Sequence, residues 1–179
     1  MYPPQEDSYM LLEQVKKYAK GKVLDMGTGS GIQAQGAAGK NEVESVLAAD
    51  IDRKVISELK KTIGNPKIKF IISDLFSGIF EKYDTIIFNP PYLPREERDE
   101  KIKDKALFGG KEGYEILERF FSQVKRCLND NGIILIVFSS FTKKEKVDEI
   151  IEKYGFKFEE LDRKHIFFED LLVYKIERR

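Results

Sequence analysis

Short apolar runs alternate with amphipathic segments along the chain. Five runs have the length and composition expected of buried strands, and they cover 23–26, 46–49, 68–72, 85–88 and 133–138. The run at 133–138 is apolar without interruption, which is typical of a parallel strand buried on both faces. The pattern therefore predicts a β-sheet in which at least one strand, at 133–138, is buried on both faces.

Helical spacing of apolar residues fills the intervals between these runs. A first helix is expected over 8–19, with Asp7 and Ser8 as candidate N-caps. The clearest pattern lies at 113–128, where apolar residues recur every three or four positions and charged residues occupy the opposite face. A further amphipathic helix is expected over 143–154.

The last two apolar segments, 156–161 and 171–176, predict a closing hairpin at one edge of the sheet. Asn131 and Gly132 are expected to close the long helix region and open the fifth strand. Alternating strand and helix units favour an α/β fold with a mostly parallel, seven-stranded sheet and helices on both faces. With no repeat or linker in view, we expect one domain over 1–179.

Composition narrows the classes of function. Lys and Arg number 31, as do Asp and Glu, so no net field draws the molecule toward nucleic acid or an anionic membrane. No apolar run approaches the roughly 18 residues of a membrane span, and Met1 leads into a Pro- and Glu-containing stretch, so we expect a cytoplasmic, soluble protein. Cys127 is the one cysteine, which excludes an internal disulfide and a thiolate metal cluster, and we expect it in the core. His165, the one histidine, is expected at a surface or hairpin position without a catalytic role.

A glycine-rich loop at 25–31 follows the first predicted strand and precedes a helix. This is where an open parallel sheet binds a nucleotide-like ligand. Gly27, Gly29 and Gly31 lack Cβ, so the loop can adopt positive φ and approach a ligand closely. Counted from Gly29, the spacing with Ala34 also satisfies the G-x-G-x-x-A pattern of dinucleotide binders, so spacing alone leaves a nicotinamide cofactor open.

Acidic residues at the ends of the predicted strands favour a different cofactor. Asp50 follows Gly31 by 19 residues and can accept hydrogen bonds from both hydroxyls of a ribose. Asp74 can accept from an adenine amine, with Leu75 or Phe76 as an apolar contact to the ring. Asp25 would repel a pyrophosphate but suits the ammonium group of an amino-acid cofactor. Adenosine together with an ammonium group indicates S-adenosylmethionine.

The tetrapeptide Asn-Pro-Pro-Tyr at 89–92 ends the fourth predicted strand. Its two prolines stiffen the segment and remove two backbone donors, so the segment presents carbonyl groups. A planar NH₂ group can donate one hydrogen to the Asn89 side-chain oxygen and the other to the Pro90 carbonyl, while Tyr92 stacks on the flat substrate. Because this strand is predicted to lie beside the glycine-loop strand, both motifs are expected to converge on one cleft. Transfer from a sulfonium neutralises charge, so the scheme needs no metal and no strong base.

These residues resemble the HemK-like glutamine-N5 methyltransferases, which are class I S-adenosylmethionine-dependent enzymes that modify the Gly-Gly-Gln loop of translation release factors. The likeness spans nearly the whole chain. The opening segment 2–8, Tyr-Pro-Pro-Gln-Glu-Asp-Ser, is similar to the Y-x-P-x-E-D-[ST] start of the archaeal and eukaryotic branch. Residues 106–113 are similar to the A-x-x-G-G-x-x-G stretch of the same family.

The resemblance implies a Rossmann-like methyltransferase fold in which the helical segment 1–20 packs on the cofactor site. Together with the motifs, it implies a cofactor set comprising Ser8, Asp25, Gly27, Gly29, Gly31, Asp50, Ile51, Ser73, Asp74, Leu75 and Asn89. The implied catalytic residues are Asn89, Pro90 and Tyr92, and Pro91 joins them in holding the substrate amide. The branch commonly works with a small zinc-binding activator, so a heterodimer through an exposed sheet edge is implied. The long helical amino-terminal domain of bacterial members is lacking, which leaves the docking of the release factor open.

Other functions stay open at this point. Enzymes with Asn-Pro-Pro-Tyr also methylate adenine N6, cytosine N4 and guanine N2 in DNA or RNA. The basic clusters 143–146 and 163–165 could touch RNA, although such runs are more typical of solvated faces. A non-catalytic subunit with this fold is a further alternative, against which the intact Asp25, Asp50 and Asn89 argue. Residues 94–105, dense in charge, are expected to form a mobile loop over the cleft.

Overall fold

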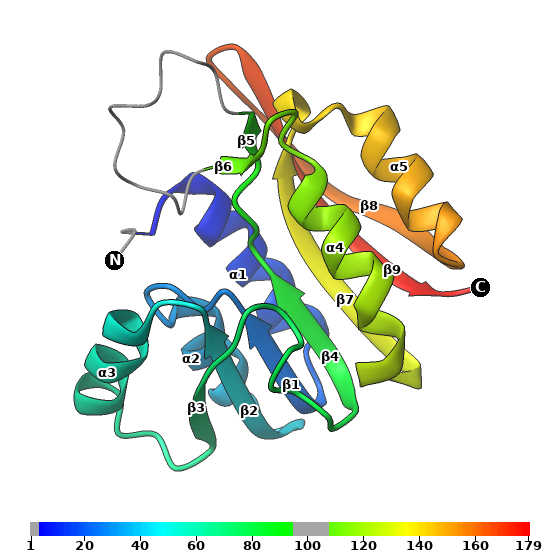
Figure 1. Cartoon of the computed structure of the whole chain (residues 1–179). Coiled ribbons are helices and arrows are strands. Elements are labelled where there is room, and N and C mark those ends of the chain that lie inside the picture. The colour runs from blue at the N-terminus through cyan, green and yellow to red at the C-terminus, as the bar shows by residue number, and fades with distance from the viewer. Residues whose placement is uncertain (1–3, 95–107) are drawn as a thin grey trace.

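A seven-stranded sheet forms the centre of the computed structural model, which describes residues 4–94 and 108–179 (Figure 1). Its strands are β1 (Gly21–Met26), β2 (Val43–Asp50), β3 (Ile68–Ile72), β4 (Tyr83–Phe88), β7 (Leu128–Ser139), β8 (Phe156–Ile166) and β9 (Glu169–Arg178). Their order is β3-β2-β1-β4-β7-β9-β8. The first five strands in this order are parallel, whereas β9 is antiparallel to β7 and to β8. The predicted mostly parallel sheet with a terminal hairpin is confirmed.

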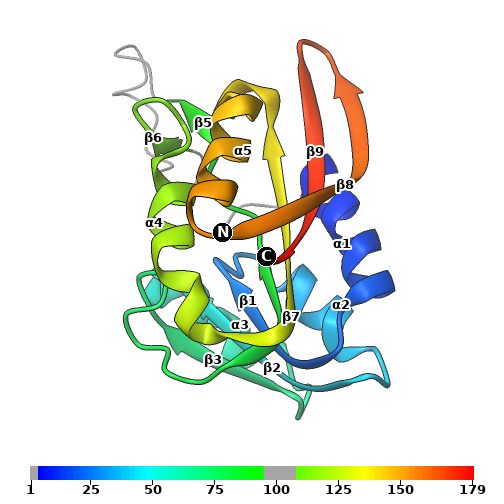
Figure 2. The same cartoon turned by 90° about the vertical axis from the view of Figure 1, so that its right-hand side faces the viewer.

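Helices cover both faces of the sheet (Figure 2). They are α1 (Glu6–Tyr18), α2 (Ile32–Ala38), α3 (Arg53–Thr62), α4 (Glu115–Val124) and α5 (Lys144–Lys153), with short 3₁₀ turns η3 (Lys125–Cys127) and η4 (Ser140–Thr142). Helices α4 and α5 pack on one face, and α1 and α2 pack on the other. A small parallel pair, β5 (Leu93–Pro94) and β6 (Phe108–Gly110), was not predicted.

Strand β7 is buried on both faces, as its apolar run predicts. Ile134, Ile136 and Phe138 belong to the cluster under α4 and α5. The intervening residues belong to the cluster under α1 and α2, and they are Ile133, Leu135 and Val137. Since successive side chains of a strand point to opposite faces, one apolar run supplies both cores. Cys127 is buried in the first of these cores, as expected.

The predicted start of the first helix is wrong by two residues. Helix α1 begins at Glu6, and its N-cap is Gln5, whose side chain makes no capping hydrogen bond. Asp7 and Ser8 therefore lie inside the first turn and are not N-caps. The Asp7 carboxylate accepts instead from the Ser8 backbone N–H at 2.6 Å and from side chains outside the helix. Tertiary contacts at this end outweigh the local capping preference.

The predicted end of the long helix is also wrong. Helix α4 stops at Val124, and β7 already begins at Leu128, so Asn131 and Gly132 lie within the strand. The pairing of β7 with β4 shifts register here, which leaves room for a bulge. A Cβ at Gly132 would lie 3.0 Å from the Tyr83 carbonyl oxygen, so the two strands approach closely at this point. Apolar spacing alone could not separate the last helical turn from the start of this irregular strand.

Two further expectations concern regions at the limits of the described chain. The predicted mobile loop 94–105 lies outside the described residues except for Pro94, and the segment 106–113 is described only from Phe108 onward. Among the described residues, no helix is both long enough and apolar enough to cross a bilayer.

Candidate active site

The glycine loop leaves the carboxyl end of β1 and leads into α2. Gly27, Gly29 and Gly31 have φ values of 64°, 51° and 77°, as the sequence predicted. At Gly31 an added Cβ would lie 2.8 Å from Cδ1 of Ile63, which would have to move, and the positive φ itself disfavours any side chain there. The loop therefore presents bare backbone at the sheet edge.

Asp25 lies at the tip of β1 and is almost fully buried, with 1% of its surface exposed. Its Oδ2 accepts from the Thr28 hydroxyl at 2.6 Å and from the Ala34 N–H at 3.1 Å. Burial raises the pKa of this carboxyl from 3.8 to about 7, although these two hydrogen bonds lower it in part. A cation placed beside Asp25 would offset the cost of its charge.

Asp50 connects the tip of β2 to the glycine loop. Its Oδ2 accepts from the Gly29 N–H at 3.0 Å, and its Oδ1 accepts from the Asp52 N–H at 2.9 Å. Each carboxylate oxygen has two lone pairs, so each can accept one more hydrogen bond from a ligand. Ile51 beside it is 67% exposed and offers apolar surface at the same edge.

The loop after β3 holds the remaining predicted cofactor residues. The Ser73 hydroxyl donates to the Leu75 carbonyl at 2.6 Å and accepts from the Gly78 N–H at 3.1 Å, so it shapes the loop. Leu75 is buried and has a φ of 45°. Asp74 is paired through both oxygens with Arg119 of α4, at 3.1 and 3.0 Å. Both hydrogen bonds come from the same guanidinium nitrogen, Nη2, and both side chains are about half exposed, so Asp74 still faces solvent.

Asn89 follows the end of β4, which pairs in parallel with β1. Met26 and Phe88, the last residues of these two strands, are register partners. The glycine loop and the Asn-Pro-Pro-Tyr segment therefore start side by side at one edge of the sheet, as predicted. Pro90 is buried, and the Thr142 hydroxyl donates to the Tyr92 carbonyl at 3.0 Å, which fixes the end of the segment.

The first turn of α1 reaches both motifs. The Asn89 Nδ2 donates to Oδ2 of Asp7 at 3.2 Å, and the Tyr92 hydroxyl donates to the same oxygen at 3.1 Å. The Gln33 Nε2 of α2 donates to the Ser8 carbonyl at 2.8 Å. Ser8 thereby lies between the glycine-loop helix and the Asn-Pro-Pro-Tyr segment.

Sequence reasoning missed Asp7, Gln33 and Arg119. Asp7 was interpreted as a helix cap, although it is also the Asp of the segment similar to Y-x-P-x-E-D-[ST], and no role at the site was assigned to it. Gln33 is 3% exposed, and its Oε1 has no hydrogen-bond partner within the described structure. The segment 32–38 holds a second glutamine, Gln35, so no signal in the sequence distinguished Gln33. Arg119 lies on the charged face of an amphipathic helix and had no distinguishing pattern.

The charged clusters that might have met RNA are paired within the protein. The ion pairs join Lys143 to Glu112, Lys144 to Asp148, Lys146 to Glu149, Arg163 to Glu160, Lys164 to Glu6 and His165 to Asp170. His165 lies on the exposed hairpin, as expected. Paired surface charges of this kind are typical of a solvated face.

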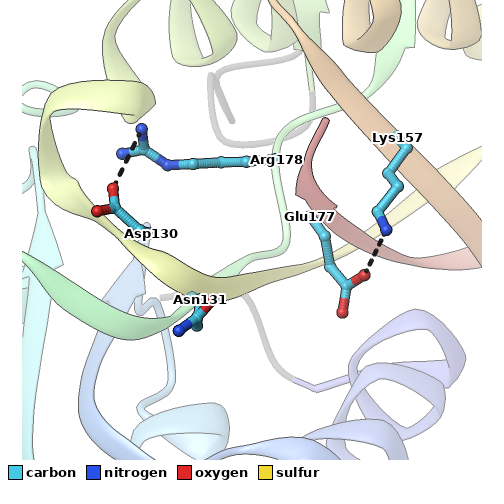
Figure 3. A pocket seen from close by; sticks show the side chains of 6 residues that line it. Asp130, Asn131, Lys157, Glu177 and Arg178 are labelled. Carbon is cyan, nitrogen blue, oxygen red and sulfur yellow. Dashed lines mark ion pairs between the residues drawn. The ribbon is translucent and has the colours of Figure 1, made fainter.

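A cavity of about 220 Å³ lies at the other end of the strands, where β7 begins and β9 ends (Figure 3). Its charged side chains pair with each other: Arg178 lies 3.6 Å from Asp130, and Lys157 lies 3.4 Å from Glu177. None of its lining residues belongs to the glycine loop or to the Asn-Pro-Pro-Tyr segment. Within the described part of the chain, no cluster of three or more His, Cys, Asp or Glu side chains is arranged to hold a metal ion.

Comparison with known proteins agrees with this arrangement. The family model for the methyltransferase small domain matches residues 5–167. The chain belongs to this family. A relative in Methanocaldococcus jannaschii, provisionally named a protein N5-glutamine methyltransferase, is 36% identical over 178 residues, which are 97% of this chain and 89% of the relative. The release factor glutamine methyltransferase of Streptococcus pneumoniae is 34% identical over 153 residues, which are 80% of this chain but 50% of that longer protein.

A solved structure shares the fold. The E. cuniculi Mtq2–Trm112 complex, described as responsible for the methylation of the translation termination factor eRF1, superposes with a TM-score of 0.78 at 23% identity, covering 99% of this chain and 98% of the matched chain. The resemblance to the HemK-like enzymes is thus confirmed, and the chain is a methyltransferase. Membership of a methyltransferase family favours a methyl donor over a nicotinamide dinucleotide at the glycine loop.

Proposed function

We propose that this protein transfers a methyl group from S-adenosylmethionine to the side-chain amide of the glutamine in the Gly-Gly-Gln loop of a translation release factor. The observation that carries the proposal is the pairing of β1 with β4. It sets a loop suited to an adenosine-containing methyl donor beside an Asn-Pro-Pro-Tyr segment suited to a flat NH₂ group. Methyl donor and acceptor would then meet at one edge of the sheet.

The residues at this edge fit the proposed cofactor. Asp50 keeps an open lone pair on each oxygen for the two ribose hydroxyls, and the exposed Ile51 can contact the adenine. Asp25 is a buried acid with a raised pKa, and a neighbouring ammonium group would favour the ionised form of its carboxyl. The remaining proposed contacts come from Ser8, Gly27, Gly29, Gly31, Ser73, Asp74, Leu75 and Asn89. When bound, S-adenosylmethionine supplies an electrophilic methyl group on a sulfonium.

The acceptor amide would be held by two oxygens of the chain. The Asn89 Oδ1 and the Pro90 carbonyl each accept one hydrogen of the glutamine NH₂, which fixes the direction of the nitrogen lone pair. Pro91 stiffens the segment, and Tyr92 closes one side of the cleft against water. The amide nitrogen would gain the methyl group as the sulfonium S–C bond breaks and would then lose its proton to water, so no strong base is needed. Catalysis in this scheme is positioning.

The substrate class follows from the relatives. The M. jannaschii relative is named for N5-glutamine methylation, the S. pneumoniae relative for release factors, and the E. cuniculi complex for eRF1. A release factor in the cytoplasm is accordingly our proposed substrate. Within the described residues, the basic clusters 143–146 and 163–165 are ion-paired, which gives less support to the alternative, methylation of RNA or DNA.

We also propose a small zinc-binding activator as a partner, by analogy with the Mtq2–Trm112 complex. Strands β3 and β8 form the two edges of the main sheet. Strand β8 is rich in charged residues, which discourage edge pairing, whereas β3 reads Ile-Lys-Phe-Ile-Ile and exposes 45% of Ile72. The edge of β3 is the more suitable docking site.

A methyl-transfer assay with labelled S-adenosylmethionine tests the proposed function. The wild-type protein, with and without the co-expressed activator, is offered a release factor, the same factor with its loop Gln changed to Ala, tRNA and duplex DNA. We expect label on the unmodified release factor alone. Equal labelling of the Gln-to-Ala factor would refute the proposed acceptor, and labelling of tRNA or DNA in its place would favour the alternative.

A further inference from the structure

Asp7 is a buried carboxylate with four hydrogen-bond donors around it. It is 4% exposed. Its Oδ1 accepts from the Ser8 N–H at 2.6 Å and from the Ser8 hydroxyl at 3.1 Å. Its Oδ2 accepts from Nδ2 of Asn89 at 3.2 Å and from the Tyr92 hydroxyl at 3.1 Å. A carboxylate offers about four lone-pair positions, so these donors use its full accepting capacity.

A side-chain amide can be turned either way unless its neighbours distinguish oxygen from nitrogen. A carboxylate can only accept, so only the Asn89 NH₂ can face Oδ2 of Asp7 favourably. The opposite orientation would bring two acceptors together and leave both without a donor. Asp7 therefore selects the orientation in which the Asn89 oxygen is directed away from α1.

Donation to a carboxylate also affects the acceptor end of the same amide. Hydrogen bonds in sequence polarise one another, so an Asn89 NH₂ bonded to Asp7 carries more negative charge on Oδ1. That oxygen then accepts more strongly from a substrate NH₂. Asp7 thus improves both the direction and the strength of the Asn89 acceptor without touching the substrate.

The same carboxylate oxygen holds Tyr92. Its hydroxyl is bonded to Asp7, and its backbone carbonyl accepts from Thr142. Tyr92 is therefore held at its hydroxyl and at its backbone, and its hydroxyl bonds to the same Asp7 oxygen as Asn89. One residue on α1 connects the amide acceptor to the aromatic wall.

We infer that Asp7 is a positioning residue of the active site, which sets the Asn89 amide with its oxygen toward the substrate and anchors Tyr92. The inference rests on the proposed function for its catalytic consequence. Its structural part, the fixed orientation of the Asn89 amide, stands without any substrate.

The kinetic test uses Asp7→Asn, which keeps size, and Asp7→Ala in the full-length protein. We expect kcat for methylation of the release factor to fall about 10- to 100-fold, the range for loss of a hydrogen bond to a charged group. The KM for S-adenosylmethionine should change less than kcat, because the Asp25 and Asp50 contacts are intact and only Ser8 and Asn89 of the proposed cofactor contacts are bonded to Asp7. The matched control is Glu6→Gln, one residue away, which contacts Lys164 and none of the site side chains; its kcat should be unchanged. A kcat of Asp7→Asn within about twofold of wild type would overturn the inference.

A second readout needs no activity. In a ¹H–¹⁵N spectrum, the Asn89 side-chain NH₂ signals are identified by their loss in Asn89→Ala. We expect them to shift and to exchange faster with water in Asp7→Asn, but not in Glu6→Gln. Unmoved signals would refute the inference, even if kcat falls. If wild type methylates no release factor, the proposed function fails, while this spectrum still tests Asp7. Should Asp7→Ala fail to fold, Asp7→Asn carries both tests.

Discussion

At the residue scale, the proposed mechanism depends most on Asn89. It ends the strand beside the glycine loop, and its amide nitrogen is already bonded to Asp7. We propose that its oxygen accepts a hydrogen bond from the planar NH₂ group of the substrate. The hydrogen bond from Asn89 to Asp7 joins two residues that lie far apart in the sequence, and in our proposal it orients the Asn89 amide.

Replacing Asn89 with Ala should abolish turnover and spare the cofactor. We expect the rate of methyl transfer to fall by about 100-fold or more, as for the loss of a group that acts in the transition state. The affinity for S-adenosylhomocysteine, measured by calorimetry, should stay within about threefold. Asn131→Ala is the control and should remain active, because Asn131 lines the cavity where β7 begins (Figure 3). Full activity of Asn89→Ala would remove the proposed mechanism.

Asp25 connects function to a pH-dependent cost in stability. Its folded-state pKa of about 7 lies above the ordinary 3.8, so folding carries no penalty from this group below pH 3.8 and the full penalty above pH 7. Without cofactor, Asp25→Asn should therefore be more stable than wild type by about 2–4 kcal/mol at pH 8 and by less at pH 5. Urea unfolding at both pH values measures this.

The same variant should bind S-adenosylhomocysteine at least about tenfold more weakly, since the cofactor ammonium loses its partner. A stability gain that is equal at pH 5 and pH 8 would show that the charge of Asp25 is not its cause. Unfolding measures the stability lost by burying the Asp25 carboxylate, and binding measures what that carboxylate contributes to cofactor affinity.

Sequence reasoning at this scale succeeded where chemistry is local. The positive φ of Gly29 and Gly31, and the place of Asp50 at a strand tip, follow from a loop and its flanking strand. It failed for Asp7, whose partner Asn89 is 82 positions away. No local pattern records a contact of that separation.

At the scale of elements, the β8–β9 hairpin has an unusual turn. Phe167 has a φ of 50° and is 87% exposed, and the adjacent Phe168 is 90% exposed. Left-handed backbone costs an ordinary side chain about 1 kcal/mol, while Asn tolerates it better. The turn is therefore held by the pairing of its two strands and not by its own residues.

Phe167→Asn should stabilise the protein by about 0.5–1 kcal/mol, because it relieves this strain and exposes less apolar surface. Thermal or urea unfolding measures the gain. Phe168→Asn is the matched control, since it changes the same surface at a residue without positive φ. Equal gains in both variants would assign the effect to the loss of exposed apolar surface and not to relief of the backbone strain at Phe167.

The boundaries of elements were predictable only where apolar spacing and local turn signals agree. Strand β3 was predicted at its observed residues, 68–72. The junction of α4 and β7 was not, because Leu128 fits the helical spacing and yet pairs with Tyr83 as a strand residue. Pairing between strands decided the outcome there, and a single segment carries no information about it.

At the scale of the whole molecule, the alternation of strands and helices was enough to predict the parallel sheet, the hairpin and the adjacency of β1 and β4. The order of strands follows from the handedness and shortness of connections between them. What the alternation does not contain is the docking of α1 on the far motif, since a first helix could pack at several places on the same face. The contact surfaces offered to partners are likewise a property of the assembled sheet.

The exposed edge at β3 gives a prediction at this scale. Ile72→Lys should weaken association with the small activator by about tenfold or more, because a charge at an open strand edge opposes pairing. Co-purification of the co-expressed pair measures this. Lys157→Glu on β8, the other edge, should leave the pair intact. A heterodimer that survives Ile72→Lys but is lost in Lys157→Glu would move the interface to β8.

The central claim is that one edge of the sheet holds a methyl donor and a flat NH₂ group face to face. A crystal structure of the protein with S-adenosylhomocysteine and a peptide containing Gly-Gly-Gln tests it most directly. We predict the glutamine amide nitrogen at about 3 Å from the Asn89 Oδ1 and facing the cofactor sulfur, with Asp50 on the ribose. A glutamine bound away from Asn89, or a cofactor bound away from the glycine loop, would contradict the account.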